Sequence, residues 1–120
     1  MEAIREIRQL KDLEEALADS SARTVLLFKH SLTCPISMRA YNELISYLEE
    51  ADPEVSYNLI TVQTARPISN EIASRLGLRH ESPQAILVRD GRQIWNASHF
   101  SITSASLRQA IEAHKKQPAT

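Results

Sequence analysis

The feature that most restricts the fold of this chain is a short apolar run, TVLLF at residues 24–28, in which polar and apolar residues do not alternate. It consists of β-branched, aliphatic and aromatic residues, which favour strands. A strand with one face in water alternates polar with apolar residues, whereas a strand covered by helices on both faces does not. The run therefore predicts a central strand in an α/β fold.

Four other segments have the apolar spacing of amphipathic helices. Pro35 and Pro67 suit helix starts, because the first turn does not need the N–H that proline lacks. Gly77 suits the end of the helix that begins at Pro67. We expect the last residues, KQPAT, to fray. The predicted helices are residues 10–19, 35 to about 50, 67–76, and a closing helix that contains Leu107, Ala110, Ile111 and His114.

Two further regions have the composition of strands. Residues 57–63, YNLITVQ, predict a strand parallel to the first, because a helix connects the two. Residues 84–97 form two strand-like runs around Asp90-Gly91, a dipeptide that tolerates the positive φ angles of a tight hairpin. The order of elements implies a mixed sheet of about four strands, a parallel pair plus an antiparallel hairpin, flanked by about four helices.

Length and charge narrow the class of protein. At 120 residues the chain suits one domain, which we expect to span residues 1–120. Its 14 basic and 15 acidic side chains leave no positive excess for a nucleic-acid backbone. No apolar run approaches the roughly 20 residues that cross a bilayer, and the first residues are too charged for a signal peptide. We expect a cytoplasmic protein that binds neither nucleic acid nor membrane.

The only cysteine, Cys34, lies where the first predicted strand turns into a helix. A residue there meets unpaired backbone N–H groups and the positive end of the helix dipole, and both favour a thiolate. Because Pro35 has no N–H, the expected donors to the sulfur are the backbones of Ile36 and Ser37, with the Ser37 hydroxyl as a further candidate. Cys34 is thus a candidate nucleophile whose disulfide partner must be another molecule.

A cysteine at this position could also be a buried structural residue or a metal ligand. Free cysteine is often buried, but a place between Thr33 and Pro35 at a turn favours exposure. Lys29 or His30 could add positive charge, although neighbouring strand residues face opposite sides, so at most one should help. Structural zinc requires four protein ligands, and one thiol with scattered histidines is a weak match, so no metal is expected.

The order of elements, the cysteine at the first strand-to-helix turn and Ser82-Pro83 before the hairpin together resemble the thioredoxin fold. In that family the proline is cis, lies opposite the cysteine and presents the preceding backbone to the substrate. The resemblance implies supporting roles for Ser82 and Pro83. Without it, Ser-Pro is an ordinary turn dipeptide.

A narrower resemblance covers nearly the whole chain. The segments KHSLTCPIS, VQTARPISNEIA, GLRHESPQAILVRDG and SHFSIT are similar to YtxJ-type bacilliredoxins, monothiol proteins of the bacillithiol system. The family removes bacillithiol from proteins that carry it as a mixed disulfide. The resemblance therefore implies Cys34 as the nucleophile, supported by Pro35, with bacillithiol as co-substrate and S-bacillithiolated proteins as clients.

Dithiol relatives carry a second cysteine three residues after the first, and here that residue is Ser37. A serine oxygen cannot resolve a mixed disulfide, so a low-molecular-weight thiol or a reductase must do so. Ser37 therefore predicts a monothiol cycle. The alternative is an ordinary polar residue in the first turn of a helix.

Bacillithiol carries a malate group, whose carboxylates basic side chains can bind. The candidates are Arg66, Arg79 and His80, because in this fold the loops that carry them should approach the cysteine. For each, the alternative is an ordinary solvated surface position.

Two other functions are compatible with the sequence. One is an iron–sulfur carrier in which two chains share a cluster through Cys34 and bound thiols, since two cysteines alone leave a cluster short of ligands. The other is a non-catalytic thioredoxin-like adaptor in which the cysteine is incidental.

Overall fold

The computed structural model describes residues 4–115, so the expectation for KQPAT lies outside the described residues. Every predicted helix and strand is present, with small shifts of its ends. The elements are β1 (Ile4–Glu6), α1 (Leu10–Asp19), β2 (Val25–His30), α2 (Pro35–Leu48), β3 (Ser56–Thr61), α3 (Arg66–Leu76), β4 (Gln84–Arg89), β5 (Arg92–Ser98), the short 3₁₀ helix η1 (His99–Ser101) and α4 (Ser104–Lys115).

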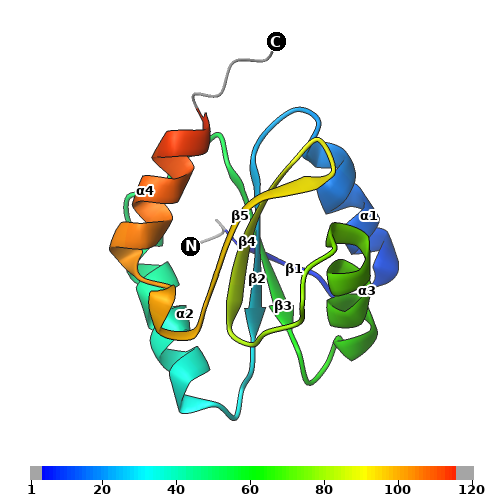
Figure 1. The fold of residues 1–120 in the computed structure, drawn as a ribbon, viewed down its shortest axis with the longest axis horizontal. Coiled ribbons are helices and arrows are strands. Elements are labelled where there is room, and N and C mark those ends of the chain that lie inside the picture. The colour runs from blue at the N-terminus through cyan, green and yellow to red at the C-terminus, as the bar shows by residue number, and fades with distance from the viewer. Residues whose placement is uncertain (1–3, 116–120) are drawn as a thin grey trace.

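The sheet is mixed and has the strand order β1-β3-β2-β4-β5. Strands β1 and β2 both run parallel to β3, whereas β4 runs antiparallel to β2 and forms a hairpin with β5. Helices α2 and α4 cover one face and α1 and α3 the other (Figure 1). The α/β class and the sheet of mixed strand direction are confirmed.

Five strands form this sheet where about four were predicted. The additional strand, β1, has only three residues, IRE, of which two are charged. Such a segment has no periodicity to reveal it. Its partner lies far along the chain, since Ile4 pairs with Tyr57 of β3. Pairing of the backbone, not a local pattern, creates this edge strand.

Strand β2 also extends two residues beyond its predicted end, through Lys29 and His30, and both are buried. Burial of a polar side chain is unfavourable unless the protein supplies its hydrogen-bond partners, as it does for these two. The predicted hairpin is confirmed, because Asp90 and Gly91 adopt φ angles of 54° and 74°.

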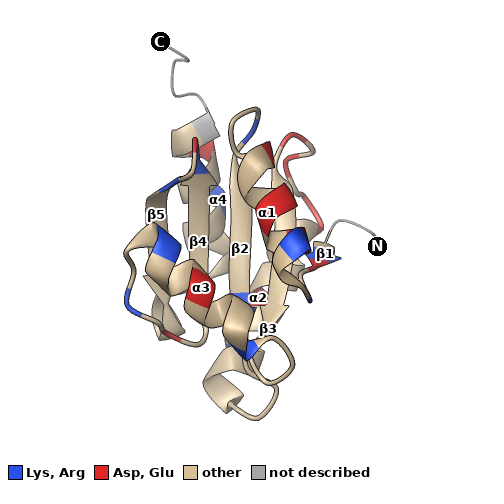
Figure 2. Cartoon of the chain, turned by 90° about the vertical axis from the view of Figure 1, so that its right-hand side faces the viewer, with Lys and Arg blue, Asp and Glu red and all other residues tan. Residues whose placement is uncertain are grey.

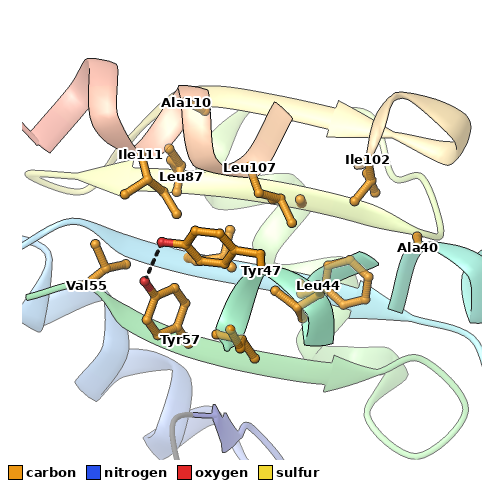
Figure 3. Packing of buried hydrophobic residues seen from close by; sticks show 14 residues of the cluster. Ala40, Leu44, Tyr47, Val55, Tyr57, Leu87, Ile102, Leu107, Ala110 and Ile111 are labelled. Carbon is orange, nitrogen blue, oxygen red and sulfur yellow. Dashed lines mark hydrogen bonds between the residues drawn. The ribbon is translucent and has the colours of Figure 1, made fainter. Parts of the chain in front are cut away.

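Side chains of β2 alternate between two apolar layers, which explains why its sequence does not alternate. Leu26 and Phe28 pack towards α2 and α4, in the cluster of Figure 3. Val25 and Leu27 belong to the cluster that includes residues of α1 and α3. All four are fully buried. The strand is therefore the centre of both halves of the core.

Pairing of the strands brings three loops to one edge of the sheet. Lys29 near the end of β2 lies opposite Gln84 at the start of β4, and His30 lies beside Thr61 at the end of β3. The segments after β2, after β3 and before β4 therefore meet at this edge. Lys and Arg colouring marks the end of β2 and the start of α3, while acidic residues lie on α1 (Figure 2).

Among the helices described here, none is long and apolar enough to span a membrane.

Candidate active site around Cys34

Cys34 is the residue immediately before helix α2 and has extended backbone angles, φ −108° and ψ 119°. Its carbonyl accepts the N–H of Met38 at 3.0 Å, which closes the first turn. Pro35 occupies the start of the helix, as predicted. Cys34 is partly exposed. It is not a core cysteine, because both apolar clusters form without it.

The loop before Cys34 is held by Gln63, which follows β3. The Gln63 side chain accepts the N–H of Leu32 at 3.1 Å. It also donates to the hydroxyls of Ser31 at 2.8 Å and Thr33 at 3.3 Å. The sequence places Gln63 only at the end of a predicted strand, and its position after an apolar run carries no local signal of this role. One amide thus binds three residues of the cysteine loop.

Ser37 is fully buried and does not serve the sulfur as expected. Its hydroxyl accepts the N–H of Ser31 at 2.8 Å and lies 2.8 Å from Nδ1 of His30. Within the described residues, the Cys34 side chain makes no capping hydrogen bond, so the predicted donors of Ile36 and Ser37 do not reach it. The Ser37 hydroxyl instead links the end of β2 to the first turn of α2.

His30 lies inside the protein on the α2 side of the sheet. Its ring stacks on Tyr41, with centroids 4.8 Å apart and planes inclined by 23°. Burial lowers the pKa of His30 below its usual range, so the imidazole is neutral at neutral pH. At neutral pH His30 therefore adds no positive charge to Cys34, which is compatible with the expectation that at most one of the two upstream basic residues does so.

Lys29 faces α3, on the opposite side of the sheet from the helix that Cys34 caps. It is fully buried. Its ammonium donates to the carbonyl of Ser69 at 3.1 Å and lies 3.1 Å from Nδ1 of His80. Burial lowers the pKa of Lys29 to about 8. Lys29 therefore acts on α3 and the following loop, not on the thiol.

The Ser82-Pro83 peptide bond is cis, as the thioredoxin resemblance implied. Pro83 is buried and comes directly before β4, whose first residue, Gln84, lies opposite Lys29. Lys29 is five residues before Cys34, so the proline and the cysteine belong to the same edge of the sheet. The carbonyl of Pro83 accepts the N–H of His99 at 3.2 Å.

The three basic candidates are all exposed. Arg66 is the first residue of α3, and Arg79 and His80 lie in the loop from α3 to β4. Burial and then the positive charges of Lys29 and Arg66 lower the pKa of His80, while Glu81 opposes them. The charge of Arg66 therefore acts on the His80 ring. For Arg79 the contact is through its backbone, whose carbonyl accepts Nε2 of Gln84 at 3.2 Å.

A sequence model of the monothiol bacilliredoxin BrxC family matches residues 5–107 of the chain. The chain belongs to the monothiol bacilliredoxin family. The single cysteine and Ser37 of this bacilliredoxin agree with a monothiol site. The family implies thiol chemistry related to bacillithiol, with protein substrates and partners that recycle the thiol.

Solved structures agree with this assignment. A protein described as a candidate oxidoreductase with a thioredoxin fold is 32% identical, with a TM-score of 0.79 over 90% of this chain and 93% of its own. Fasciola hepatica thioredoxin, 18% identical, has a TM-score of 0.74 over 92% and 99% of the two chains. Poplar thioredoxin h, also 18% identical, has 0.77 over 97% and 99%. The fold is that of thioredoxin, and the family and fold together support a thiol oxidoreductase.

Proposed function

We propose that this bacilliredoxin removes bacillithiol from S-bacillithiolated proteins in the cytoplasm, through a mixed disulfide at Cys34. The observation that carries the proposal is a partly exposed, solitary thiol at the start of α2 in a chain of this family. The position where a resolving thiol would stand holds Ser37, which is fully buried and hydrogen-bonded.

In the first step the Cys34 thiolate attacks the bacillithiol sulfur of a client's mixed disulfide. A bond forms between Cys34 Sγ and that sulfur, the client's S–S bond breaks, and the client leaves as a thiolate that takes up a proton. No net oxidation occurs, because one disulfide replaces another. The protein now carries bacillithiol.

The second step requires an external thiol. Its thiolate attacks the bacillithiol sulfur, which releases Cys34 as a thiolate and leaves bacillithiol in a new disulfide. Ser37 cannot perform this step, because a serine oxygen does not displace a disulfide sulfur. A low-molecular-weight thiol or a reductase must therefore complete each cycle.

Two features at this edge of the sheet suit a client and its bound bacillithiol. Leu32 and Met38 flank Cys34 in the chain and are 57% and 42% exposed, which offers an apolar surface to a protein partner. In the proposal the Ser82 backbone and Pro83 receive the client chain, the role implied by the thioredoxin fold.

The basic residues Arg66, Arg79 and His80 are proposed to bind the malate carboxylates of bacillithiol. Guanidinium and imidazole N–H groups donate charge-assisted or neutral hydrogen bonds to carboxylates. Support comes from their exposure and from the electrostatic proximity of Arg66 to His80.

Intact-mass spectrometry of the full-length protein mixed with a bacillithiolated client tests the proposal. We expect the client to lose its adduct while Cys34 gains a disulfide-linked bacillithiol. A Cys34→Ser variant is the control and should leave the client modified. A wild-type protein that never acquires the adduct would refute the proposal.

The other two functions have different signatures in the same preparation. A visible absorption band after anaerobic reconstitution with iron, sulfide and bacillithiol would favour the cluster carrier. Partner capture that survives Cys34→Ser, without adduct transfer, would favour the adaptor.

A further inference from the structure

A fully buried lysine lies behind the candidate site. Lys29 has no exposed surface and sits on the sheet face that packs against α1 and α3. Within residues 4–115, no carboxylate forms an ion pair with its ammonium. Burial of a cation without a counterion opposes folding. A buried lysine with this cost, held by contacts to Ser69 and His80, points to a role beyond packing.

The contacts of His80 with Lys29 and Ser69 determine which of its ring nitrogens carries the proton. Nδ1 of His80 lies 3.1 Å from the Lys29 ammonium and 3.2 Å from the hydroxyl of Ser69. An ammonium only donates, so Nδ1 must accept and cannot carry the proton of a neutral ring. The proton is therefore on Nε2. His80 is exposed, and Nε2–H is its remaining donor.

A second contact on the same face holds the same loop. Gln84 lies directly opposite Lys29 in the antiparallel pair, so both side chains point to one face of the sheet. Its amide donates to the carbonyl of Arg79 at 3.2 Å. Lys29 and Gln84 thus hold two consecutive residues, Arg79 and His80, of the loop that leads to Pro83. Through Ser69, Lys29 also joins this loop to α3.

We propose that Lys29 is a positioning residue that keeps His80 as an Nε2–H donor beside Arg66, where the two receive a carboxylate of the thiol substrate. The inference rests on the proposed function, because it requires Cys34 to exchange disulfides with an anionic low-molecular-weight thiol. Lys29 itself does not touch the substrate. Its effect is on recognition of the acidic group and not on exchange between sulfur atoms.

The electrostatics of the cluster agree with this role. Burial, Lys29 and Arg66 lower the pKa of His80 and outweigh the opposite effect of Glu81, so the ring is neutral at neutral pH. Burial lowers the pKa of Lys29 to about 8, so at pH 7 Lys29 is mainly an ammonium that donates. Arg66 lies three residues before Ser69 on α3, and the Ser69 hydroxyl contacts His80, so helix spacing puts Arg66 on the side of α3 near this ring. In the proposal the neutral imidazole and the always charged Arg66 together bind one carboxylate.

The tautomer of His80 gives a test that does not depend on catalysis. Nitrogen-15 NMR of the wild-type protein should show Nδ1 unprotonated and Nε2 protonated. In Lys29→Met the pKa of His80 should rise and the tautomer preference should weaken, whereas the exposed-lysine variant Lys11→Met should match wild type. A wild-type proton on Nδ1, or an unchanged His80 in Lys29→Met, would overturn the inference.

Disulfide selectivity tests the consequence for recognition. The experiment compares the rate at which Cys34 reacts with oxidised bacillithiol with its rate towards neutral bis(2-hydroxyethyl) disulfide. For Lys29→Met the ratio of the two rates should fall about fivefold, the effect of a weakened polar contact. For Lys11→Met it should not change. An unchanged ratio in Lys29→Met would overturn the inference.

If Lys29→Met does not fold, His80→Ala provides a second test. His80 is exposed, so this variant should fold. It should lower the same ratio, and a wild-type ratio in this variant would also overturn the inference. If wild-type Cys34 reacts with neither disulfide, the proposed function fails. The NMR result then still decides whether Lys29 sets the state of His80.

Discussion

The hydroxyl of Ser37 lies 2.8 Å from Nδ1 of His30, inside the protein. The same oxygen accepts the N–H of Ser31 at 2.8 Å, so its own proton is available to the His30 nitrogen. Ser37 therefore does more than replace a resolving thiol. It joins the last residue of β2, the cysteine loop and the first turn of α2, and so fixes the approach of the chain to Cys34.

Ser37→Ala should lower the free energy of unfolding by about 1–3 kcal/mol, because the Ser31 N–H and the His30 ring lose a buried partner. Urea denaturation measures the change. Ser46→Ala on the exposed side of the same helix is the matched control and should change stability by less than about 0.5 kcal/mol. Equal stabilities of the two variants would contradict the structural role of Ser37.

Gln63→Ala should loosen the loop before Cys34, because three hydrogen bonds to Ser31, Leu32 and Thr33 disappear. We expect faster amide exchange at Leu32 and a several-fold slower transfer of bacillithiol to Cys34, since a less ordered nucleophile is presented less often in a reactive geometry. Gln109→Ala on the exposed face of α4 is the control. Unchanged protection of the Leu32 amide would show that the clamp is not needed.

The stability of the protein should depend on Lys29 at alkaline pH. Its folded pKa, about 8, is below the unfolded value of 10.5, so the unfolded chain binds more protons between these values. The contribution of Lys29 to stability therefore rises as pH increases from about 8 to 10.5, by at most about 3 kcal/mol. Wild type should gain stability over this range relative to Lys29→Met. Parallel curves for the two proteins would be the opposite result.

His30 should produce the corresponding effect in acid. Its folded pKa is lowered by burial, so the unfolded chain binds the proton more readily. Stability present above the unfolded pKa is lost as pH falls through about 6.5 and towards the folded value. Denaturation of wild type and His30→Asn between pH 7.5 and about 5 measures this difference, and the variant should show the smaller loss. Equal slopes would mean that His30 does not contribute.

Arg66→Ala should reduce the rate at which Cys34 reacts with oxidised bacillithiol by about tenfold, the effect of one charge-assisted hydrogen bond. Its reaction with a neutral disulfide should fall much less. Arg23→Ala, which removes an exposed arginine paired with Asp19, is the matched control. Similar losses for both disulfides would assign Arg66 to general electrostatics rather than to carboxylate binding.

Local patterns in the sequence were sufficient for most of the fold. The apolar run of β2, the helical spacing and the turn at Asp90-Gly91 all act over a few residues, and steric and solvation effects at that range determine them. Short-range effects also explain why Cys34 directly precedes α2, because Pro35 favours the first position of a helix. The cis bond at Pro83 was anticipated only through the resemblance to thioredoxin.

Short-range effects along the chain thus account for the elements, their order and the position of the single thiol. Long-range packing of the folded chain instead produces the pairing of β1, the hydrogen bonds of Gln63 to the cysteine loop and the burial of Lys29 with His80 as its partner. These contacts join residues 30 to about 50 positions apart, such as Lys29 and His80, which are separated by 51. Strand register and helix packing set them, because a polar side chain can be buried only where the folded chain supplies its hydrogen-bond partner.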